Sequence, residues 1–437
     1  MERERGISRR GFLHRGIAAL GAAVVPCIVP ASALGRGGAT PPSDRVAMGF
    51  IGVGGQGGGH LLGGAWTYLT GGYVAREDVA VLAVCDIWRD RRERATQRVN
   101  ESYASRYDKG SYKAAEAYRD FRDVLARDDI DAVLIGSPVH WHALMTVMAA
   151  KAGKDVYCEK PCLLTVREGR AMVDAVRRYG RVYQAGTQQR SEYGGKFRLA
   201  CELARSGRIG KLQSVYAMLG GGGFTDGGAY SGTGVPVPDT LDWELFLGPA
   251  PWRPFGGHTD AHMFGWGSIN WGQHHYDIVQ WGIDADNTGP TDIYWEDGKL
   301  TYKYASGVLV YGCPYPGEKV GGSGGCTFVG TEGRIAVDRE NIVSYPPSIL
   351  EQPLGPDDVH LYHCNSHSAN FLDCVRTRKR AICDVEVSHR AMSIILLGGI
   401  ATQLNRPLKW DPQREEFLND PQANRMLSVA MRPPWRL

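Results

Sequence analysis

One stretch decides the fold of the first part of the chain: Val46-Ala47-Met48-Gly49-Phe50-Ile51-Gly52-Val53-Gly54-Gly55-Gln56-Gly57. The first six residues are apolar and favour a β-strand, and the glycines that follow allow a tight turn into a helix. Backbone N–H groups at such a helix start bind anions, so Gly52, Gly54 and Gly57 predict a pyrophosphate site. A glycine loop that binds nothing is the alternative, because this motif alone is weakly specific.

A carboxylate after the second apolar run strengthens the dinucleotide interpretation. Val79–Cys85 predicts a strand, and Asp86 follows it directly. A carboxylate at this place accepts hydrogen bonds from the adenosine ribose and repels a 2′-phosphate, which favours NAD over NADP. Asp86 comes later after the glycines than this motif usually has it, so Trp66–Glu77 is predicted to be an insertion.

The alternation of strands and helices predicts the fold class. Residues 46–186 read as a doubly wound parallel sheet, because apolar strand-like runs alternate with helical periodicity. The rhythm changes near Gly186, and residues 187–437 predict an α+β domain on a large, mostly antiparallel open sheet. The expected elements are strands at 132–136, 155–158, 181–185, 211–219, 293–295, 299–304, 308–311, 327–330 and 335–337, and helices at 88–107, 141–152, 165–179, 191–206, 366–376 and 388–404.

The first 33 residues predict an export signal. Arg9-Arg10 precede a short apolar run, and Ala31-Ser32-Ala33 gives a cleavage pattern. This combination indicates a twin-arginine signal cleaved after Ala33, a folded passenger for that export machinery and a periplasmic location. Residues 34–45 then form a linker, and no stable membrane insertion is expected. A basic tail beside a chance apolar helix is the alternative.

Charge and cysteine content exclude several other classes of protein. Without residues 1–33 the chain holds 45 basic and 45 acidic residues, which gives no electrostatic footprint for nucleic acid. Nine cysteines remain, without a CxxC pair, so a disulfide framework is not expected. His140 and His142 have no third ligand nearby, and no metal site is predicted.

Two further motifs hold candidate catalytic groups. Glu159-Lys160-Pro161 follows a strand, where a lysine can polarise the oxygen of a substrate. Gly272-Gln273-His274-His275-Tyr276-Asp277 offers a histidine that can accept a hydroxyl proton. Alone, the first would be solvated charge and the second a structural histidine. Only one of His274 and His275 can face the cleft, and the motif does not decide which.

Four motifs in order resemble the glucose–fructose oxidoreductase/inositol dehydrogenase/MocA (Gfo/Idh/MocA) family. They are Gly52–Gly57 with Asp86, Ser137-Pro138-Val139-His140-Trp141-His142, Glu159-Lys160-Pro161 and Gly272–Asp277. The twin-arginine signal and the run Ala430–Leu437 resemble the exported branch of that family. The resemblance implies an N-terminal Rossmann domain, bound NAD and a homo-oligomer, either a dimer or a tetramer.

The resemblance also assigns roles to individual residues. It implies that the cofactor is bound by Gly52, Gly54, Gly57, Asp86, Ser137, Pro138, His142, Glu159 and Lys160. Lys160 also touches substrate, and His274 matches the catalytic histidine. Asn270 departs from the family, which often has an aspartate there; an amide cannot act as a base. The further residues expected to contact substrate are Asn270, Trp271, His275 and Asp277.

These observations lead to three functional hypotheses. The first is an enzyme that moves a hydride from a secondary hydroxyl of a sugar, glycoside or cyclitol to NAD, which export would require to be tightly bound. The second is a redox-neutral glycosidase or lyase that oxidises its substrate transiently, for which Asn270 leaves room. The third is a non-catalytic NAD- or sugar-binding protein, against which the presence of both Lys160 and His274 argues.

Overall fold

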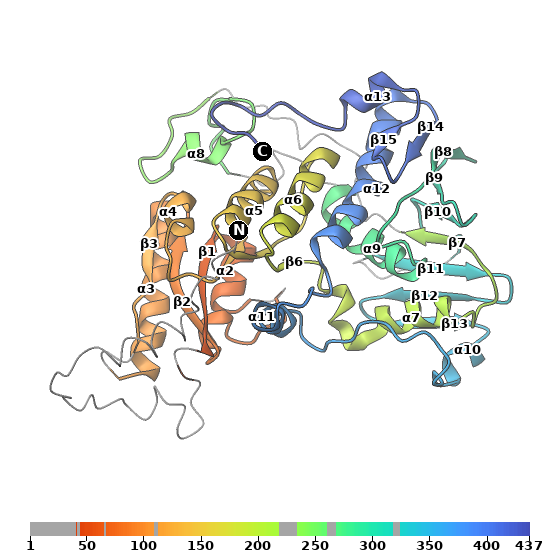
Figure 1. The fold of residues 1–437 in the computed structure, drawn as a ribbon, viewed down its shortest axis with the longest axis horizontal. Helices are drawn as coiled ribbons and strands as arrows, with labels where there is room; N and C mark the ends of the chain where they lie inside the picture. The colour runs from red at the N-terminus through yellow and green to blue at the C-terminus, as the bar shows by residue number, and fades with distance from the viewer. Residues whose placement is uncertain are drawn as a thin grey trace, which may run out of the picture. The chain divides into compact units, whose positions relative to one another are not determined.

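The parallel sheet predicted from the first motif is present. In the computed structural model, six parallel strands form a sheet in the order β3-β2-β1-β4-β5-β6 (Figure 1). The strands are β1 (Val46–Ile51), β2 (Val79–Cys85), β3 (Glu116–Tyr118), β4 (Ala132–Ile135), β5 (Asp155–Cys158) and β6 (Tyr183–Ala185). The strand order reverses between β1 and β4, and ligands of such sheets bind at this switch point. The structure describes residue 41 and residues 44–64, 67–108, 112–217, 234–259, 268–317 and 324–437.

Helices cover both faces of this sheet because its strands are apolar on both sides. One face packs against α2 (Gly55–Leu62) and α3 (Arg89–Arg106), and the other against α4 (Phe121–Leu125), α5 (His142–Lys151) and α6 (Val166–Arg178). The predicted helices agree with α3, α5 and α6 to within a residue or two. Thr165, predicted as the first residue of α6, is its N-cap and forms a capping box with Glu168.

The second sheet has nine strands in the order β13-β12-β11-β7-β10-β9-β8-β14-β15. All its pairings are antiparallel except that between β7 and β10, so the predicted mostly antiparallel sheet is confirmed. Its strands are β7 (Leu212–Ala217), β8 (Asp292–Glu296), β9 (Lys299–Lys303), β10 (Leu309–Tyr311), β11 (Gly325–Gly330), β12 (Arg334–Asp338), β13 (Ile342–Tyr345), β14 (Leu408–Asp411) and β15 (Glu416–Phe417).

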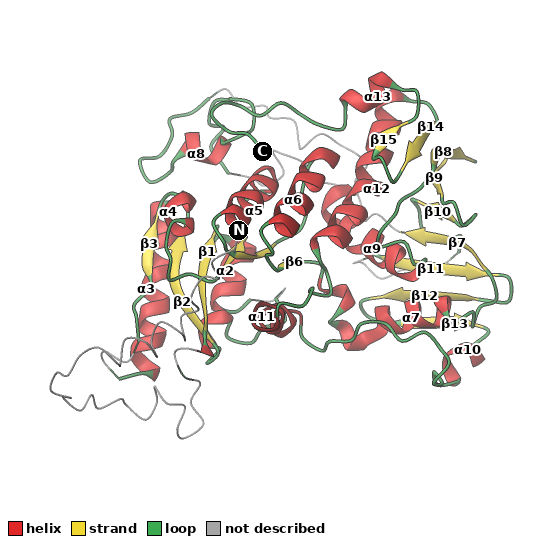
Figure 2. Cartoon of the chain, in the orientation of Figure 1, coloured by secondary structure: helices red, strands yellow, loops and turns green. Residues whose placement is uncertain are grey.

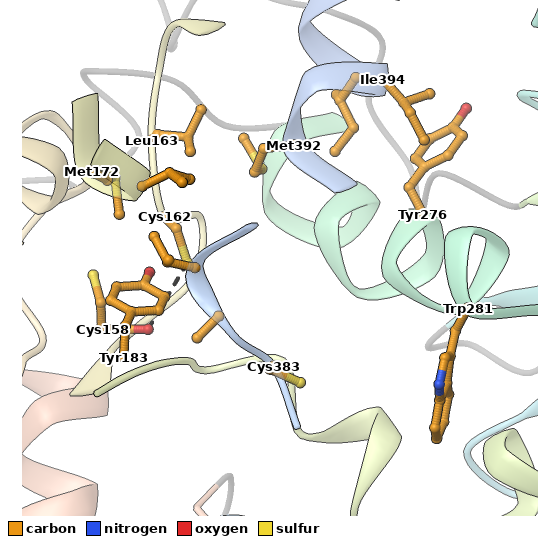
Figure 3. Packing of buried hydrophobic residues seen from close by; sticks show 14 of the residues in the cluster. Cys158, Cys162, Leu163, Met172, Tyr183, Tyr276, Trp281, Cys383, Met392 and Ile394 are labelled. Carbon is orange, nitrogen blue, oxygen red and sulfur yellow. Dashed lines mark hydrogen bonds between the residues drawn. The ribbon is translucent and has the colours of Figure 1, made fainter. Parts of the chain in front are cut away.

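Two long helices of the second half connect the sheets. The helix α9 (Ser268–Gly282) contains the whole Gly272–Asp277 motif in its middle, and it packs against α12 (Val385–Leu404). In turn, α12 packs against α6, and Figure 3 shows side chains of these three helices around one apolar core. The remaining helices are α7 (Lys196–Arg205), α8 (Trp243–Leu247), α10 (Ser348–Glu351), α11 (His367–Thr377) and α13 (Pro421–Arg425), as Figure 2 shows.

The helix α11 belongs to the second half of the sequence but completes the first sheet. Phe371 and Leu372 of α11 lie in one buried cluster with Tyr157 of β5 and Val182. The backbone N–H of Ala185 in β6 donates to the carbonyl of Cys383 at 2.9 Å. Residues 187–437 are therefore not confined to the second sheet, and residues 46–437 form one compact unit.

Several expectations concern residues that the structure does not describe. The predicted signal peptide, its cleavage site after Ala33 and most of the linker lie outside the described residues, as do Trp66 and Trp266. Among the described helices, none is long and apolar enough to cross a membrane. The nine cysteines from Cys85 onwards are all described, and all of them are free thiols.

Candidate active site

The glycine turn between β1 and α2 requires glycine for steric reasons. Gly52 has φ +80°, and a Cβ on Gly57 would lie 1.9 Å from the carbonyl oxygen of Gly52. A Cβ on Gly136, at the end of β4, would lie 2.9 Å from the same oxygen. By contrast, a Cβ on Gly55 would meet nothing within 4 Å. The chain is therefore tightly packed beneath the turn and open above it, where α2 begins.

Asp86 lies beside this turn and is buried. Its two carboxylate oxygens accept hydrogen bonds from the backbone N–H groups of Val53 and Trp88, both at 2.9 Å. Burial is the largest influence on Asp86 and raises its pKa, which these hydrogen bonds oppose. The N–H donors thus fix the carboxylate between the glycine turn and the start of α3.

An elongated cleft of about 360 Å³ runs from Asp86 past the turn to Lys160. The predicted site residues that line it are Gly52, Gly54, Asp86, Ser137, Pro138, His142, Glu159, Lys160 and Asn270. Gly57 supports the turn from below. Most of the proposed cofactor residues are thus assembled at the strand ends of one sheet, as expected for a ligand site of this fold.

His142 connects two loops of the cleft. Its Nδ1 lies 2.7 Å from the carbonyl oxygen of Pro161, and its Nε2 lies 2.6 Å from that of Ser137. Burial lowers the pKa of His142, although both carbonyl groups favour the protonated ring. The imidazole holds the Ser137 loop against the Lys160–Pro161 loop and thereby sets the width of the cleft.

Glu159 is paired with a histidine that sequence reasoning missed. His60 Nε2 of α2 lies 2.6 Å from Glu159 Oε1, and both side chains are buried. Burial opposes ionisation of Glu159, yet the hydrogen bond and charge of His60 outweigh it, so the pKa of Glu159 is lowered. A Cβ on Gly186 would lie 2.7 Å from this carboxyl group, so Gly186 makes room for it. A lone histidine on a glycine-rich helix gives no pattern by which this partner could be recognised.

Lys160 faces an amide. Its Nζ donates to Oδ1 of Asn270 at 2.5 Å and lies 5.9 Å from the ring centroid of Trp271. Burial is the main influence that lowers the pKa of Lys160; Glu159 opposes this effect and Arg339 adds to it. Asn270, the departure from the family pattern, is therefore the direct partner of the lysine.

His274 lies one turn after Asn270 on α9, on the same face of the helix. It is 3 % exposed, and its Nδ1 has no hydrogen-bond partner in the described part of the chain. Burial, then the positive charges of Lys160 and Arg339, lower the pKa of His274 well below its usual value. These influences favour the neutral form of the ring.

Two residues expected to contact substrate lie elsewhere, which corrects that expectation. His275 is fully buried, and its ring is stacked on that of Trp271 at 6.3 Å. Asp277 pairs with the buried Arg190 at 2.9 Å, and Arg190 also pairs with Asp286. Adjacent positions on a helix point in different directions, which separates His275 from His274. Asp277 lies about one turn after His274 and is instead bound by Arg190.

The tryptophans of this region fall into two groups. Trp243 and Trp281 are buried in apolar clusters, which is the commoner role for tryptophan. Trp271 is half-buried beside Lys160, whereas Trp252 is 60 % exposed. Trp271 is thus the described tryptophan of the motif that lies next to the predicted catalytic groups.

A segment of the second half covers the Asp86 end of the cleft. Arg89 N–H donates to the carbonyl of Thr240 at 2.8 Å, and Leu245, Phe246 and Thr259 line the cleft together with Trp88. A ring further along the chain packs beneath this cover, because Trp435 meets the cleft residue Trp141 edge-on at 4.8 Å. This cover was not predicted, since nothing in a Trp- and Pro-rich sequence tells which surface it packs on.

Within the described residues, no group of three His, Cys, Asp or Glu side chains is arranged to hold a metal ion.

Comparison with known proteins agrees with this geometry. Residues 46–187 match the model of the oxidoreductase family with an NAD-binding Rossmann fold, Gfo/Idh/MocA, and residues 350–437 match the model of the C-terminal alpha/beta domain of that family. A glycosyl hydrolase family 109 protein of Shewanella pealeana is 30 % identical over 210 residues, which are 47 % of this chain. That region spans only 42 % of the length of the relative.

Solved structures share the fold at low sequence identity. The WlbA dehydrogenase from Bordetella pertussis, in complex with NADH and UDP-GlcNAcA, aligns with TM-score 0.53 and 16 % identity over 84 % of this chain and 99 % of that one. The myo-inositol 2-dehydrogenase from Lactobacillus plantarum aligns with TM-score 0.52 and 17 % identity over 84 % and 99 %. From its two family matches and its fold, this chain belongs to the Gfo/Idh/MocA oxidoreductase family, and its first domain is an NAD-binding Rossmann domain.

Proposed function

We propose that this protein is an NAD-dependent oxidoreductase that oxidises a secondary hydroxyl group of a sugar, glycoside or cyclitol. The observation that supports this most is the Lys160–Asn270 pair, which lines one end of the cleft, with His274 one helical turn after Asn270. An ammonium group and a neutral imidazole are the two groups that oxidation of an alcohol needs beside a hydride acceptor.

The lining of the cleft suits a dinucleotide chemically. At the start of α2, a Cβ on Gly55 would meet nothing within 4 Å and one on Gly54 only the guanidinium group of Arg91, at 3.4 Å, which suits a pyrophosphate against backbone N–H groups. Asp86 is held by two backbone donors and has lone pairs left for ribose hydroxyls. A 2′-phosphate would meet this buried carboxylate, which supports NAD over NADP.

In the proposed reaction, His274, Lys160 and Asn270 each have a separate role. NAD, when bound, supplies the acceptor for the hydride that leaves the substrate carbon. His274 accepts the hydroxyl proton, because its positive neighbours and its burial keep the ring neutral beforehand. Lys160 stabilises the negative charge that develops on the substrate oxygen. Asn270 orients the Lys160 ammonium group and cannot itself take the proton.

Tight retention of NAD is part of the proposal. The cover formed by the segment around α8 lies over the Asp86 end of the cleft, and Trp435 packs beneath it. A dinucleotide could leave from there only if these contacts opened. A captive cofactor would suit export by the twin-arginine pathway and work in the periplasm, which we propose from the signal-like residues 1–33.

A redox-neutral glycosidase or lyase is the second candidate. Two observations favour it, the glycosyl hydrolase family 109 relatives and the amide at Asn270. In such a cycle, oxidation to a ketone acidifies a neighbouring C–H group, a base takes that proton as the substituent leaves, and a double bond forms. In a glycosidase, water then adds to the double bond, and the hydride returns to the ketone carbon. The same Lys160 and His274 would serve both reactions.

One experiment separates the candidates. Mass spectrometry identifies the cofactor released from native protein, and a panel of sugars, glycosides and cyclitols is then added to the holoenzyme. A lasting rise in NADH absorbance supports net oxidation, whereas cleavage of a glycoside without accumulated NADH supports the redox-neutral cycle. Bound NAD without turnover across the panel, or full activity of Lys160→Met or His274→Ala, would contradict the proposal.

A further inference from the structure

An arginine from the second sheet lies beside the proposed catalytic cluster. Arg339 is in the turn between β12 and β13, and this turn is stiffened by Asp338, whose Oδ1 accepts from the N–H groups of Glu340 at 2.8 Å and Asn341 at 2.6 Å. Lys196 Nζ holds the carbonyl oxygen of Arg339 at 3.3 Å. The backbone of Arg339 is therefore fixed.

The guanidinium group of Arg339 rests on aromatic rings. It lies 4.9 Å from the ring centroid of Trp271 and 4.9 Å from that of Tyr193. Its Nε donates to Oε1 of Gln189 at 3.3 Å. Stacking of this kind orients a guanidinium plane and leaves its terminal N–H groups available.

In the described part of the chain, no carboxylate pairs with Arg339, whereas the buried Arg190 pairs with Asp277 and Asp286. Lys160 lies 5.9 Å from the ring centroid of Trp271, the same ring on which Arg339 is stacked, and has an amide as its direct partner. The carboxylate adjacent to Lys160 in the sequence, that of Glu159, is already paired with His60.

We propose that Arg339 is a specificity-determining residue that selects a sugar substrate bearing an anionic substituent, best a carboxylate. Two half-buried cations around Trp271 leave positive charge that a neutral sugar would not offset. The planar guanidinium group can hold a carboxylate through two parallel hydrogen bonds. A phosphate has the same charge chemistry, so a sugar phosphate is the other source of the anion. This inference rests on the proposed function, because it names the substrate class of the same site.

The test compares matched sugars on the NAD-loaded enzyme. Binding is followed by tryptophan fluorescence for glucose and glucuronate, galactose and galacturonate, mannose and mannuronate, and for glucose 6-phosphate. We expect at least one acid to bind about tenfold more tightly than its neutral partner, with the preference falling as salt is added. Arg339→Gln should remove the preference, and Arg339→Lys should retain part of it.

A matched control removes an arginine elsewhere. Arg414→Gln deletes the same charge from a side chain that is 69 % exposed and pairs with Glu416, and it should leave the preference intact. A phosphate preferred over every carboxylate would identify the second source of the anion. Equal binding of acids and neutral sugars, or a preference that survives in Arg339→Gln, would overturn the inference. Oxidation of neutral sugars would still be visible as NADH, so the proposed function would be judged separately.

Discussion

Charged side chains are compensated differently on the two sides of the site. Here the cofactor wall means Asp86 and Glu159 with the glycine turn, and the substrate wall means Lys160 and Arg339. On the cofactor wall each carboxylate has its partner, since Asp86 accepts from two backbone N–H groups and Glu159 pairs with His60. On the substrate wall, among the described residues, the direct side-chain partner of Lys160 is the amide of Asn270, and Arg339 contacts aromatic rings and Gln189. Buried charges are costly unless compensated, so this wall is the less stable one by itself. The difference suggests that the reacting molecule completes the charge balance on one side only.

Disrupting the packing of the glycine turn should remove cofactor binding and turnover together. Gly57→Ala places a methyl group 1.9 Å from the carbonyl oxygen of Gly52, so the turn has to move. We expect loss of bound NAD and of turnover, with a destabilisation of about 3 kcal/mol. Released NAD per protein and the thermal midpoint measure this. Gly289→Ala, whose added Cβ would meet Pro412 at an ordinary 3.6 Å, is the control, and an NAD-replete Gly57→Ala protein would contradict the account of the turn.

Removing the Lys160 ammonium group should lower kcat and leave bound NAD in place. Lys160→Met removes the ammonium group but keeps the length of the side chain, and we expect kcat to fall about 100- to 1,000-fold. NAD content should stay close to that of the unchanged protein, because the turn and Asp86 are untouched. Lys151→Met, at the exposed end of α5, should leave kcat unchanged. A Lys160→Met protein with unaltered kcat would show that the ammonium group takes no part in the reaction.

Replacing Asn270 by aspartate should give Lys160 a carboxylate as its direct partner, as the charged groups of the cofactor wall already have partners. Burial lowers the pKa of Lys160, so activity that needs the ammonium group should decline at alkaline pH. Asn270→Asp adds a negative charge at the Nζ atom, which raises that pKa and should move the alkaline limb of kcat upward by about one pH unit. The pH profile of kcat measures the shift. Asn287→Asp adds the same charge at an exposed position and should leave the limb in place; a shift to lower pH in Asn270→Asp would refute this electrostatic role of the amide.

The smallest effect is expected for Trp435, whose removal should change only the rate at which NAD dissociates. Trp435→Ala removes the ring that packs edge-on against Trp141 at 4.8 Å. We expect NAD to dissociate about five times faster, because a lost aromatic contact is worth about 1 kcal/mol. Dilution into buffer with an NAD-capturing enzyme measures the rate, and Val429→Ala, at a 68 % exposed position, is the control. Unchanged dissociation would place the barrier to release elsewhere.

The residues of the cofactor wall could mostly be predicted from the sequence, and those of the substrate wall only in part. Gly52, Gly57, Asp86 and Lys160 follow strands at fixed distances, so short motifs locate them at one sheet edge. His60 and Arg339 come from a helix and a turn with no such pattern, and only tertiary packing brings them to Glu159 and Trp271. Positions within the α9 motif could not be told apart from the sequence either, because the partner of Asp277 is Arg190, which only tertiary packing brings to it.

The return of α11 to the first sheet has a consequence for the order of synthesis. The strand β6 leaves the ribosome about 200 residues before Cys383, whose carbonyl it needs at its edge. At a synthesis rate of roughly 5–20 residues per second, Phe371 and Leu372 are made some tens of seconds after Tyr157 and Val182, which they cover in the folded protein. During that interval the nucleotide-binding half exposes an unfinished apolar face, which a chaperone could shield. This part of the first sheet is therefore completed long after its own strands have been made.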